Sequence, residues 1–174
     1  TDLSKRLRET LTSECQASRL TLVGSSTSAR AEGTRKVLMA LPDGETVESV
    51  LIREDERTTL CLSSQVGCAV KCAFCATGTL GFTRDLSAAE IVAQVHAVLD
   101  FMAQAPESFD IGKRPRPQWL TNLVYMGMGE PLQNLPAVLE SVAVLGDPAA
   151  GHRDGHPHLA ARGTFERIHG VVQP

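Results

Sequence analysis

The sequence predicts an α/β fold: a partial (βα) barrel with an N-terminal β-hairpin, lacking the C-terminal half of the barrel. Two strand-like segments are each followed by a loop and a segment with helical spacing, and this regular pattern ends at Leu145. Repeated strand–loop–helix units are typical of parallel sheets and barrels. We therefore expect a remnant of an accessory region at 1–33, the hairpin at 34–57, a partial core at 58–145 and an irregular divergent tail at 146–174.

The N-terminal part is predicted to contain one helix, one loop and a hairpin. Residues 1–12 have the composition of a short polar helix, whereas 23–33 are rich in Gly, Ser and Thr and are predicted to form a loop. Two alternating runs, 34–41 and 46–53, flank a Pro-Asp-Gly-Glu segment. Asp-Gly between runs of β pattern is a strong hairpin signal.

The core is predicted to begin with a third strand at 58–63 and to continue, after a cysteine-rich loop, into a helix over 87–102. Ser87 and Glu90 form the Ser-x-x-Glu capping box that starts a helix. Apolar residues with helical spacing define its buried face, namely Ile91, Val95, Leu99 and Met102.

A second strand–helix unit follows. The linker 106–117 contains several prolines and is predicted not to be helical. The apolar run 120–126 is typical of a buried parallel strand. Asn134 is expected to cap the next helix, with Pro136 in its first turn. The side chains expected to point inward are Val138, Leu139, Val142 and Leu145.

Composition limits the classes of function. With 17 Lys and Arg against 20 Asp and Glu, the formal charge is −3, which does not give the basic footprint usual for nucleic-acid binding. The segment from Lys113 to Arg116 is the best local candidate for phosphate contact, although a solvated loop is the more ordinary interpretation. No apolar run reaches bilayer length and no leader is evident, so we expect a cytoplasmic protein.

The cysteines carry the strongest chemical signal. Three of the five are spaced C-x3-C-x2-C, at Cys68, Cys72 and Cys75. Three thiolates can bind three corners of a cubane iron–sulfur cluster, for which four are usual. The remaining iron is then open to a small molecule, as in other catalytic metal sites. S-adenosylmethionine (SAM) can chelate iron through its amine and carboxylate, so the spacing predicts a radical SAM type [4Fe–4S] site.

Other interpretations of this loop remain open. Structural zinc prefers paired C-x2-C or His-containing sets with four ligands, but only Cys72 and Cys75 form such a pair. Ordinary structural thiols are a further alternative. Phe74 lies between these two cysteines and is predicted either to shield the cluster or to be a buried core aromatic.

The sequence around these cysteines resembles a known family, the radical SAM methyltransferases that modify adenine in large-subunit ribosomal RNA. The resemblance spans about Glu32 to Leu145. Its most specific parts are Cys-Leu-Ser-Ser-Gln-Val-Gly-Cys at 61–68 and Met-Gly-Met-Gly-Glu-Pro-Leu at 126–132; Thr-Arg-Lys-Val-Leu at 34–38, Val-Glu-Ser-Val at 47–50 and Gly-Phe-Thr-Arg-Asp-Leu at 81–86 also match. The resemblance implies that 58–145 is a partial radical SAM core.

The resemblance also implies residue roles. The cysteines of the C-x3-C-x2-C motif match the cluster ligands, and Gly129 and Glu130 match the loop that holds the amino end of SAM. A glycine that lets a ligand approach the backbone, next to a carboxylate for an ammonium group, is sound chemistry by itself. Cys61 matches a cysteine that helps to resolve a covalent enzyme–RNA intermediate, and Glu48 matches a glutamate treated as a proton acceptor.

The implied reaction is methylation of adenine carbon 2 in 23S ribosomal RNA, with transfer RNA as a second candidate substrate and an external electron donor. One SAM methylates a cysteine near the enzyme's C-terminus, and a second is cleaved at the cluster to generate the radical that activates this methyl group. No cysteine follows Cys75 here, and the resemblance fades after Leu145. We therefore expect a truncated chain, whose tail arises from a frameshift or early stop. This chain alone is not predicted to be a working catalyst.

Two alternative functions stay open at this point. The chain is either a different radical SAM enzyme, which cleaves SAM without methylating RNA, or a non-catalytic fragment that binds metal or RNA.

Overall fold

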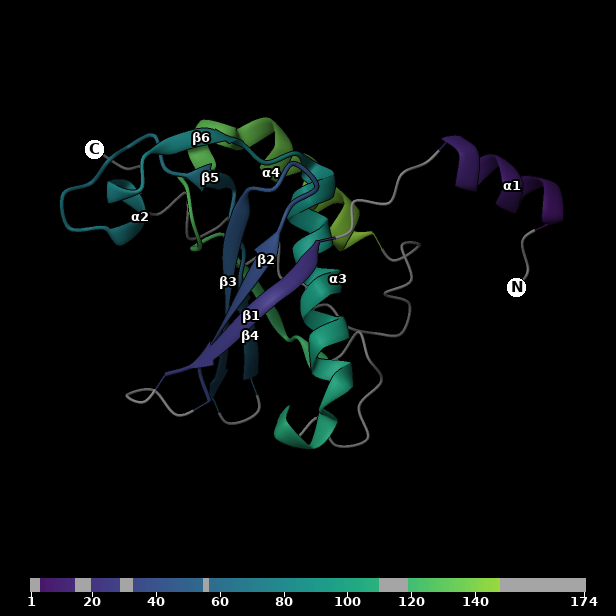
Figure 1. The fold of residues 1–174 in the computed structure, drawn as a ribbon, viewed down its shortest axis with the longest axis horizontal. Coiled ribbons are helices and arrows are strands. Elements are labelled where there is room, and N and C mark those ends of the chain that lie inside the picture. Colours follow the sequence, from purple (N-terminus) through teal and green to yellow (C-terminus); the bar gives the residue numbers. More distant parts are fainter. Residues whose placement is uncertain (1–3, 15–19, 29–32, 55–56, 110–118, 148–174) are drawn as a thin grey trace.

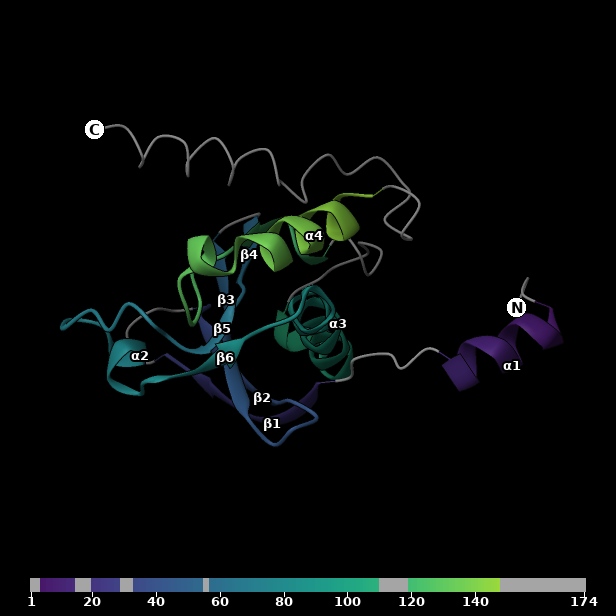
Figure 2. The ribbon, with the colours of Figure 1, turned by 90° about the horizontal axis from the view of Figure 1, so that it is seen from above.

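A mixed sheet forms the centre of the molecule, with the two longest helices on one face. In this computed structural model the described residues are 4–14, 20–28, 33–54, 57–109 and 119–147. The five-stranded sheet has the order β1-β2-β3-β4-β7. Helices α3 (Ala88–Gln104) and α4 (Leu135–Gly146) lie on the same side of it, as Figures 1 and 2 show. Residues 148–174 of the predicted tail and the linker segment Lys113 to Arg116 lie outside the described residues, whereas Gly146, expected to begin the irregular tail, is the last residue of α4.

Four consecutive strands form the antiparallel part of the sheet (Figure 1). They are β1 (Thr21–Thr27), β2 (Arg35–Ala40), β3 (Thr46–Glu54) and β4 (Arg57–Cys61). Between β2 and β3, the Leu41 amide donates to the Glu45 carbonyl at 2.8 Å and Gly44 has a φ of 90°. This positive φ is the reason that the turn carries glycine.

The expectation of a loop over 23–33 is wrong for residues 23–27, which belong to β1. This strand pairs with β2 from Thr21 opposite Ala40 to Thr27 opposite Arg35. Most of its side chains are exposed because it is an edge strand. Leu22 packs against the core, whereas small polar residues suffice at the exposed positions because the backbone pairing holds them in the strand.

The strand after the linker pairs in parallel with β4, as expected for a buried parallel strand. Strand β7 (Asn122–Val124) places Leu123 beside Leu60. Antiparallel pairs can be joined by short turns, but a parallel pair needs a crossover, which α3 supplies here. The first residues of the linker, Pro106–Phe109, form a 3-10 turn (η1), contrary to the expectation that the linker is not helical. Proline is compatible with the first position of a helical turn because no N–H is needed there.

Helix α3 begins where the capping box predicts. The Ser87 hydroxyl accepts from the Glu90 amide and the Glu90 carboxylate accepts from the Ser87 amide. All four residues of the expected apolar stripe are buried, together with Gln94, whose exposed fraction is zero. The buried polar side chain in this stripe marks a contact that the apolar pattern does not predict.

Helix α4 follows the short 3-10 turn η3 (Pro131–Asn134). Val138 and Leu145 are buried as expected, and Val142 is half-buried. Leu139 is exposed instead, and Ser141 is fully buried, where its hydroxyl lies 2.7 Å from the Tyr125 hydroxyl. The mutual hydrogen bond allows the two hydroxyl groups to be buried together, which the apolar pattern alone does not anticipate.

A second, two-stranded sheet carries the cysteine loop. It pairs β5 (Gln65–Gly67) with β6 (Phe82–Asp85) and encloses the short helix α2 (Ala76–Thr79). Figure 2 shows α2 on the opposite side of the molecule from α3 and α4. A polar helix, α1 (Lys5–Glu14), is present near the N-terminus as expected. No helix among the described residues is both long and apolar enough to cross a membrane.

We predict that Gln94→Met destabilises the fold by about 2–4 kcal/mol, because it removes the partners of several buried polar groups. The Gln94 amide accepts from the Ser49 hydroxyl and the Ser63 amide, and it donates to the Ser63 carbonyl, all at 2.9 Å. Denaturant unfolding measures the change. Gln104→Met, an exposed position at the end of α3, is the matched control and should stay within about 0.5 kcal/mol of the parent. Equal effects of the two substitutions would contradict the role of Gln94.

Candidate active site

The segment Ser63-Ser64-Gln65 leaves the end of β4 and is completely buried, although all three residues are polar. Both backbone polar groups of Ser63 are bonded to the Gln94 amide. The Ser63 hydroxyl donates to the Glu48 carbonyl at 2.5 Å and accepts from the Met128 amide at 2.8 Å. Since buried polar groups need partners, these bonds fix the position of Ser63 between β3, α3 and the loop after β7.

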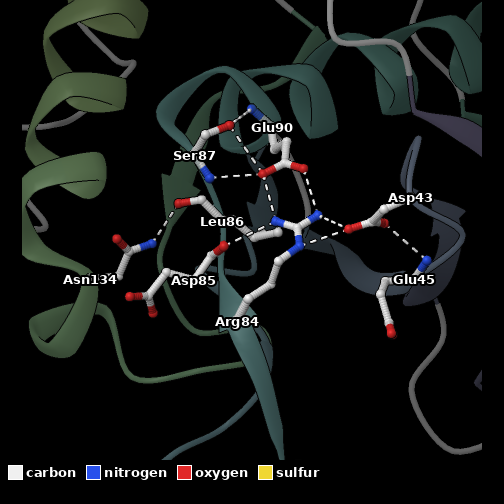
Figure 3. Close-up of polar contacts among 8 residues, drawn as sticks. All are labelled: Asp43, Glu45, Arg84, Asp85, Leu86, Ser87, Glu90 and Asn134. Carbon is white, nitrogen blue, oxygen red and sulfur yellow. Dashed lines mark hydrogen bonds and ion pairs between the residues drawn. The ribbon is translucent and has the colours of Figure 1, made fainter.

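Ser64 is held by the elements on the other side. Its amide donates to the Met128 carbonyl at 2.8 Å. Its carbonyl accepts from the Leu86 amide at 3.1 Å and from the Asn134 side chain at 2.8 Å. Asn134 also donates to the Leu86 carbonyl at 2.7 Å, as Figure 3 shows. The residue expected to cap α4 therefore makes no side-chain capping bond and instead joins two loops.

The loop after β7 approaches this segment so closely that side chains are excluded. A Cβ on Gly127 would lie 2.8 Å from the Leu62 carbonyl oxygen. A Cβ on Gly129 would lie 2.6 Å from the Gln65 Cβ, and Gly129 also has a φ of 98°. Both glycines are therefore required by space, and Gly129 also by its backbone conformation.

Gln65 links the Gly129–Glu130 loop to β6. Its carbonyl oxygen accepts from the Glu130 amide at 3.0 Å, and its NH2 group donates to Asp85 at 2.8 Å. The Glu130 carboxylate accepts from the Leu132 amide at 3.1 Å and is half-buried. A second carboxylate oxygen thus remains for a ligand at the edge of this loop.

Two glycines allow the two ends of the cysteine loop to lie close together. The Cys68 amide donates to the Gly81 carbonyl at 2.8 Å. Gly67 has a φ of 75°, and a Cβ at this position would overlap the Gly81 carbonyl oxygen. Both ends of the loop are consequently fixed where it leaves the small sheet, and Cys68 is buried there.

The other two cysteines are half-buried within the loop. The Cys75 amide donates to the Cys72 carbonyl at 3.1 Å, and Lys71 has a φ of 54°. Hydrogen bonds from the backbone amides of Gly78 and Thr77 lower the pKa of the Cys75 thiol despite some burial. A lowered pKa favours the thiolate, which is the form that binds metal. Phe74 is 93% exposed, so it is not a core aromatic.

The donor set of the cysteine loop is three thiols, and thiolates are the usual ligands of iron–sulfur clusters. Among the described residues, no three His, Cys, Asp or Glu side chains converge on a position for one metal ion. A zinc site needs such convergence, with ligands at about 2.0–2.3 Å from the ion. The thiolates of a cubane cluster bind different irons and need only line a common pocket. Cys68, Cys72 and Cys75 are free thiols on one closed loop.

Cys61 and Glu48 lie on neighbouring strands, toward the same end of the sheet. Cys61 is opposite Val50, two residues from Glu48, so alternation puts both side chains on one face. Burial raises the pKa of the Cys61 thiol, which keeps it protonated at neutral pH. The Glu48 carboxylate is paired with Lys36 at 2.7 Å, and its backbone amide donates to the Met128 sulfur at 3.3 Å.

A charged cluster that the sequence did not reveal joins the hairpin turn, β6 and α3. Arg84 forms two hydrogen bonds with Glu90, at 2.8 and 3.0 Å, and its Nε bonds to Asp43 at 2.8 Å (Figure 3). Burial raises the pKa of Glu90, but the bonds from Arg84 and Ser87 outweigh it, and the net pKa is lowered. The bond from Arg84 also lowers the pKa of Asp43. The contacts of Arg84 with Asp43 and Glu90 thus join the small sheet to the hairpin turn and to α3.

Comparison with known proteins gives several relatives. The dual-specificity RNA methyltransferase RlmN of Desulfotalea psychrophila is 54% identical over 114 residues, which cover 66% of this chain and 30% of the relative. The RlmN of Geotalea uraniireducens is 47% identical over 148 residues, 85% of this chain and 38% of the relative. A crystal structure of a radical SAM methyltransferase from Sphaerobacter thermophilus is 42% identical with a TM-score of 0.68, covering 84% of this chain and 39% of that one.

This chain belongs to the RlmN-type family. The resemblance found in the motifs is therefore confirmed, as is the mixed α/β fold. No family model matches the chain. The RlmN-type chain spans about a third of the length of the curated relatives it matches, from 30% to 38% in these two cases.

We predict that Glu90→Gln lowers the stability of this RlmN-type chain by about 1–2 kcal/mol at pH 7, because a charged hydrogen-bond partner of Arg84 is lost. The lowered pKa of Glu90 means that its contribution is present above about pH 4.3, the value of an unfolded glutamate, and disappears as the pH falls through the lower folded value. Urea unfolding between pH 7 and 3 should show the difference narrowing. Glu140→Gln, exposed on α4, is the control; a difference independent of pH would contradict the assignment.

Proposed function

We propose that this chain forms the cluster-binding and SAM-binding part of a radical SAM RNA methyltransferase. Cys68, Cys72 and Cys75 would hold a [4Fe–4S] cluster, and the Gly129–Glu130 loop would hold the amino end of SAM. The observation that carries the proposal is that the loop after β7 is hydrogen-bonded to the buried segment Ser63 to Gln65, which leads directly into the small sheet that carries the cysteine loop. The sheet would then be part of a (βα) barrel, with the parallel pair β4 and β7 as its first two strands.

The residues of the chain have distinct tasks in this proposal. The thiolates bind the cluster at a closed loop, and the buried position of Cys68 limits the access of water on one side. The Glu130 carboxylate offers an acceptor for an ammonium group, while Gly129 lets the loop pack directly against Gln65. When bound, the cluster supplies the electron that cleaves the sulfonium bond of SAM. Cofactor chemistry of this kind leaves binding and orientation to the protein.

The proposed substrate is adenine in 23S ribosomal RNA, methylated at carbon 2, with transfer RNA as a second substrate. The names of the relatives support an RNA substrate. A base must be accessible for such chemistry, which in RNA is usual for loops whose bases are splayed out. Glu48 would accept a proton, and Cys61 would resolve the covalent intermediate; their common face of the sheet supports this pairing of roles. An external electron donor completes the reaction.

We expect the full chain to take up iron and sulfide anaerobically and, with dithionite and SAM, to release 5′-deoxyadenosine. Cys72→Ala should lose both the cluster and this product because one of three ligands is missing. Iron and sulfide analysis and chromatography provide the readouts. Cys61→Ala is the matched control for cluster content, since Cys61 lies in β4 outside the loop. Equal iron binding by the parent and Cys72→Ala would contradict the proposed ligands.

The RNA substrate is tested separately in the host. The implied reaction also needs a methyl-carrying cysteine, which does not follow Cys75 in this sequence. In a host that supplies this cysteine, deletion of the gene that encodes this chain should remove 2-methyladenosine from large-subunit ribosomal RNA, as measured by mass spectrometry of digested RNA. Re-expression of the gene is the control. An unchanged content of 2-methyladenosine, together with cleavage of SAM by the chain, would favour a radical SAM enzyme with another substrate.

A further inference from the structure

The Gln65 side chain bonds directly to both the Gly129–Glu130 loop and the small sheet that carries the cysteines. We propose that Gln65 is a positioning residue, which fixes the amino end of SAM relative to the cluster by holding the Glu130 amide. This inference rests on the proposed function of the two loops. It adds a residue that would contact neither SAM nor the cluster.

The contacts of Gln65 use both ends of its amide group. The carbonyl oxygen accepts from the Glu130 amide, and the NH2 group donates to Asp85. Asp85 is also the residue opposite Gln65 in the pairing of β5 with β6. The side chain therefore acts as a strut between the small sheet and the loop after β7.

The surroundings of Gln65 leave it little freedom. Its side chain is almost completely buried, with 1% exposed, and Gly129 packs directly against its Cβ and Cγ. Its backbone amide lies 3.3 Å from the Met128 carbonyl. A buried side chain with both polar ends bonded has one favoured conformation, so it can define a distance between two loops.

The chemistry of the position selects glutamine. Methionine has a similar length but can neither accept from the Glu130 amide nor donate to Asp85. Glutamate keeps the acceptor and loses the donor. Asparagine keeps the amide group but is one methylene shorter. Substitution of Gln65 by these three residues therefore tests the acceptor, the donor and the length of the side chain separately.

The position in the chain makes this strut relevant to the proposed site. Gln65 precedes Cys68 by three residues and bonds to the amide of the residue whose carboxylate would bind the ammonium group of SAM. A ligand held at both loops requires a fixed separation between them, and small displacements weaken such binding. Losses of about 10–100-fold are typical when residues that orient a ligand-binding group are removed.

The direct test measures hydrogen exchange of the Glu130 amide by NMR in the full chain, without cofactors. Gln65→Met should accelerate this exchange at least about tenfold, because the acceptor is gone. Gln65→Glu retains an acceptor but places a second carboxyl group against Asp85, so the amide should stay protected only at a pH low enough for the two carboxyl groups to share a proton. Gln104→Met is the matched control and should leave the rate unchanged. If Gln65→Met does not fold, Gln65→Asn replaces it, with the same expected acceleration.

The second readout is the affinity of the reconstituted chain for SAM. Gln65→Met should raise the dissociation constant about tenfold or more while the iron content stays equal to that of the parent. Unchanged exchange at Glu130, or accelerated exchange with unchanged SAM affinity, would overturn the proposal. A parent chain that binds no SAM would contradict the proposed function instead, and the exchange data would then report on the strut alone.

Discussion

The site depends on one constraint: the backbone between β4 and the cysteine loop is buried, so its polar groups must be bonded by protein. An unpaired buried amide or carbonyl costs about 1–3 kcal/mol. Ser63 and Ser64 meet this requirement with partners from α3, from the loop after β7 and from the turn before α4. Each partner belongs to a different part of the chain. The burial of this short segment thus orders all of them around it.

This arrangement gives two ligand-binding loops a common reference. The cysteine loop is long and has few internal bonds, but its ends are fixed by β5, β6 and the close contact of Gly67 with Gly81. The loop after β7 is fixed by the Met128 contacts and by the close approach of Gly129 to Gln65. A metal cluster on one loop and an organic ligand on the other would therefore meet at a defined separation. Preorganisation of this kind is what binding across two loops requires.

Local sequence signals predicted the elements whose stabilising contacts are local. The capping box of Ser87 and Glu90 and the apolar stripe of α3 depend on spacings of three and four residues, and both agree with the structure. The edge strand β1 was missed because its Ser and Thr side chains carry no apolar pattern, and its pairing partner alone makes it a strand. The apolar pattern predicts that Leu139 is buried because it does not reveal the hydrogen bond between Tyr125 and Ser141, which lies on the adjacent, buried face of α4.

In the site, too, features that are local in the sequence were predictable and contacts between distant residues were not. The cysteine spacing and the Gly-Met-Gly-Glu segment were visible in the sequence, whereas the residues that hold them in place were not. Asn134 was identified as a helix cap, yet it bonds to loops 48 and 70 residues away in the chain. Gln94 bonds to residues 31 and 45 positions away, and Arg84 bonds to Asp43, 41 positions away. In the sequence, Gln94 is only a polar residue within the apolar stripe of α3, and Arg84 is only a charged residue in a short strand next to a capping box. Neither pattern identifies the residue that each side chain contacts.

The most direct test of the account is electron paramagnetic resonance of the reconstituted, dithionite-reduced chain, recorded with and without SAM. Cys68, Cys72 and Cys75 leave one iron of a [4Fe–4S] cluster without a protein ligand, and the Gly129–Glu130 loop would hold SAM beside it. The expected result is the signal of a reduced [4Fe–4S] cluster whose g values shift when SAM is added, with no shift on addition of 5′-methylthioadenosine, a control that lacks the amine and the carboxylate. A cluster signal that SAM leaves unchanged, or the absence of any cluster signal, would contradict it.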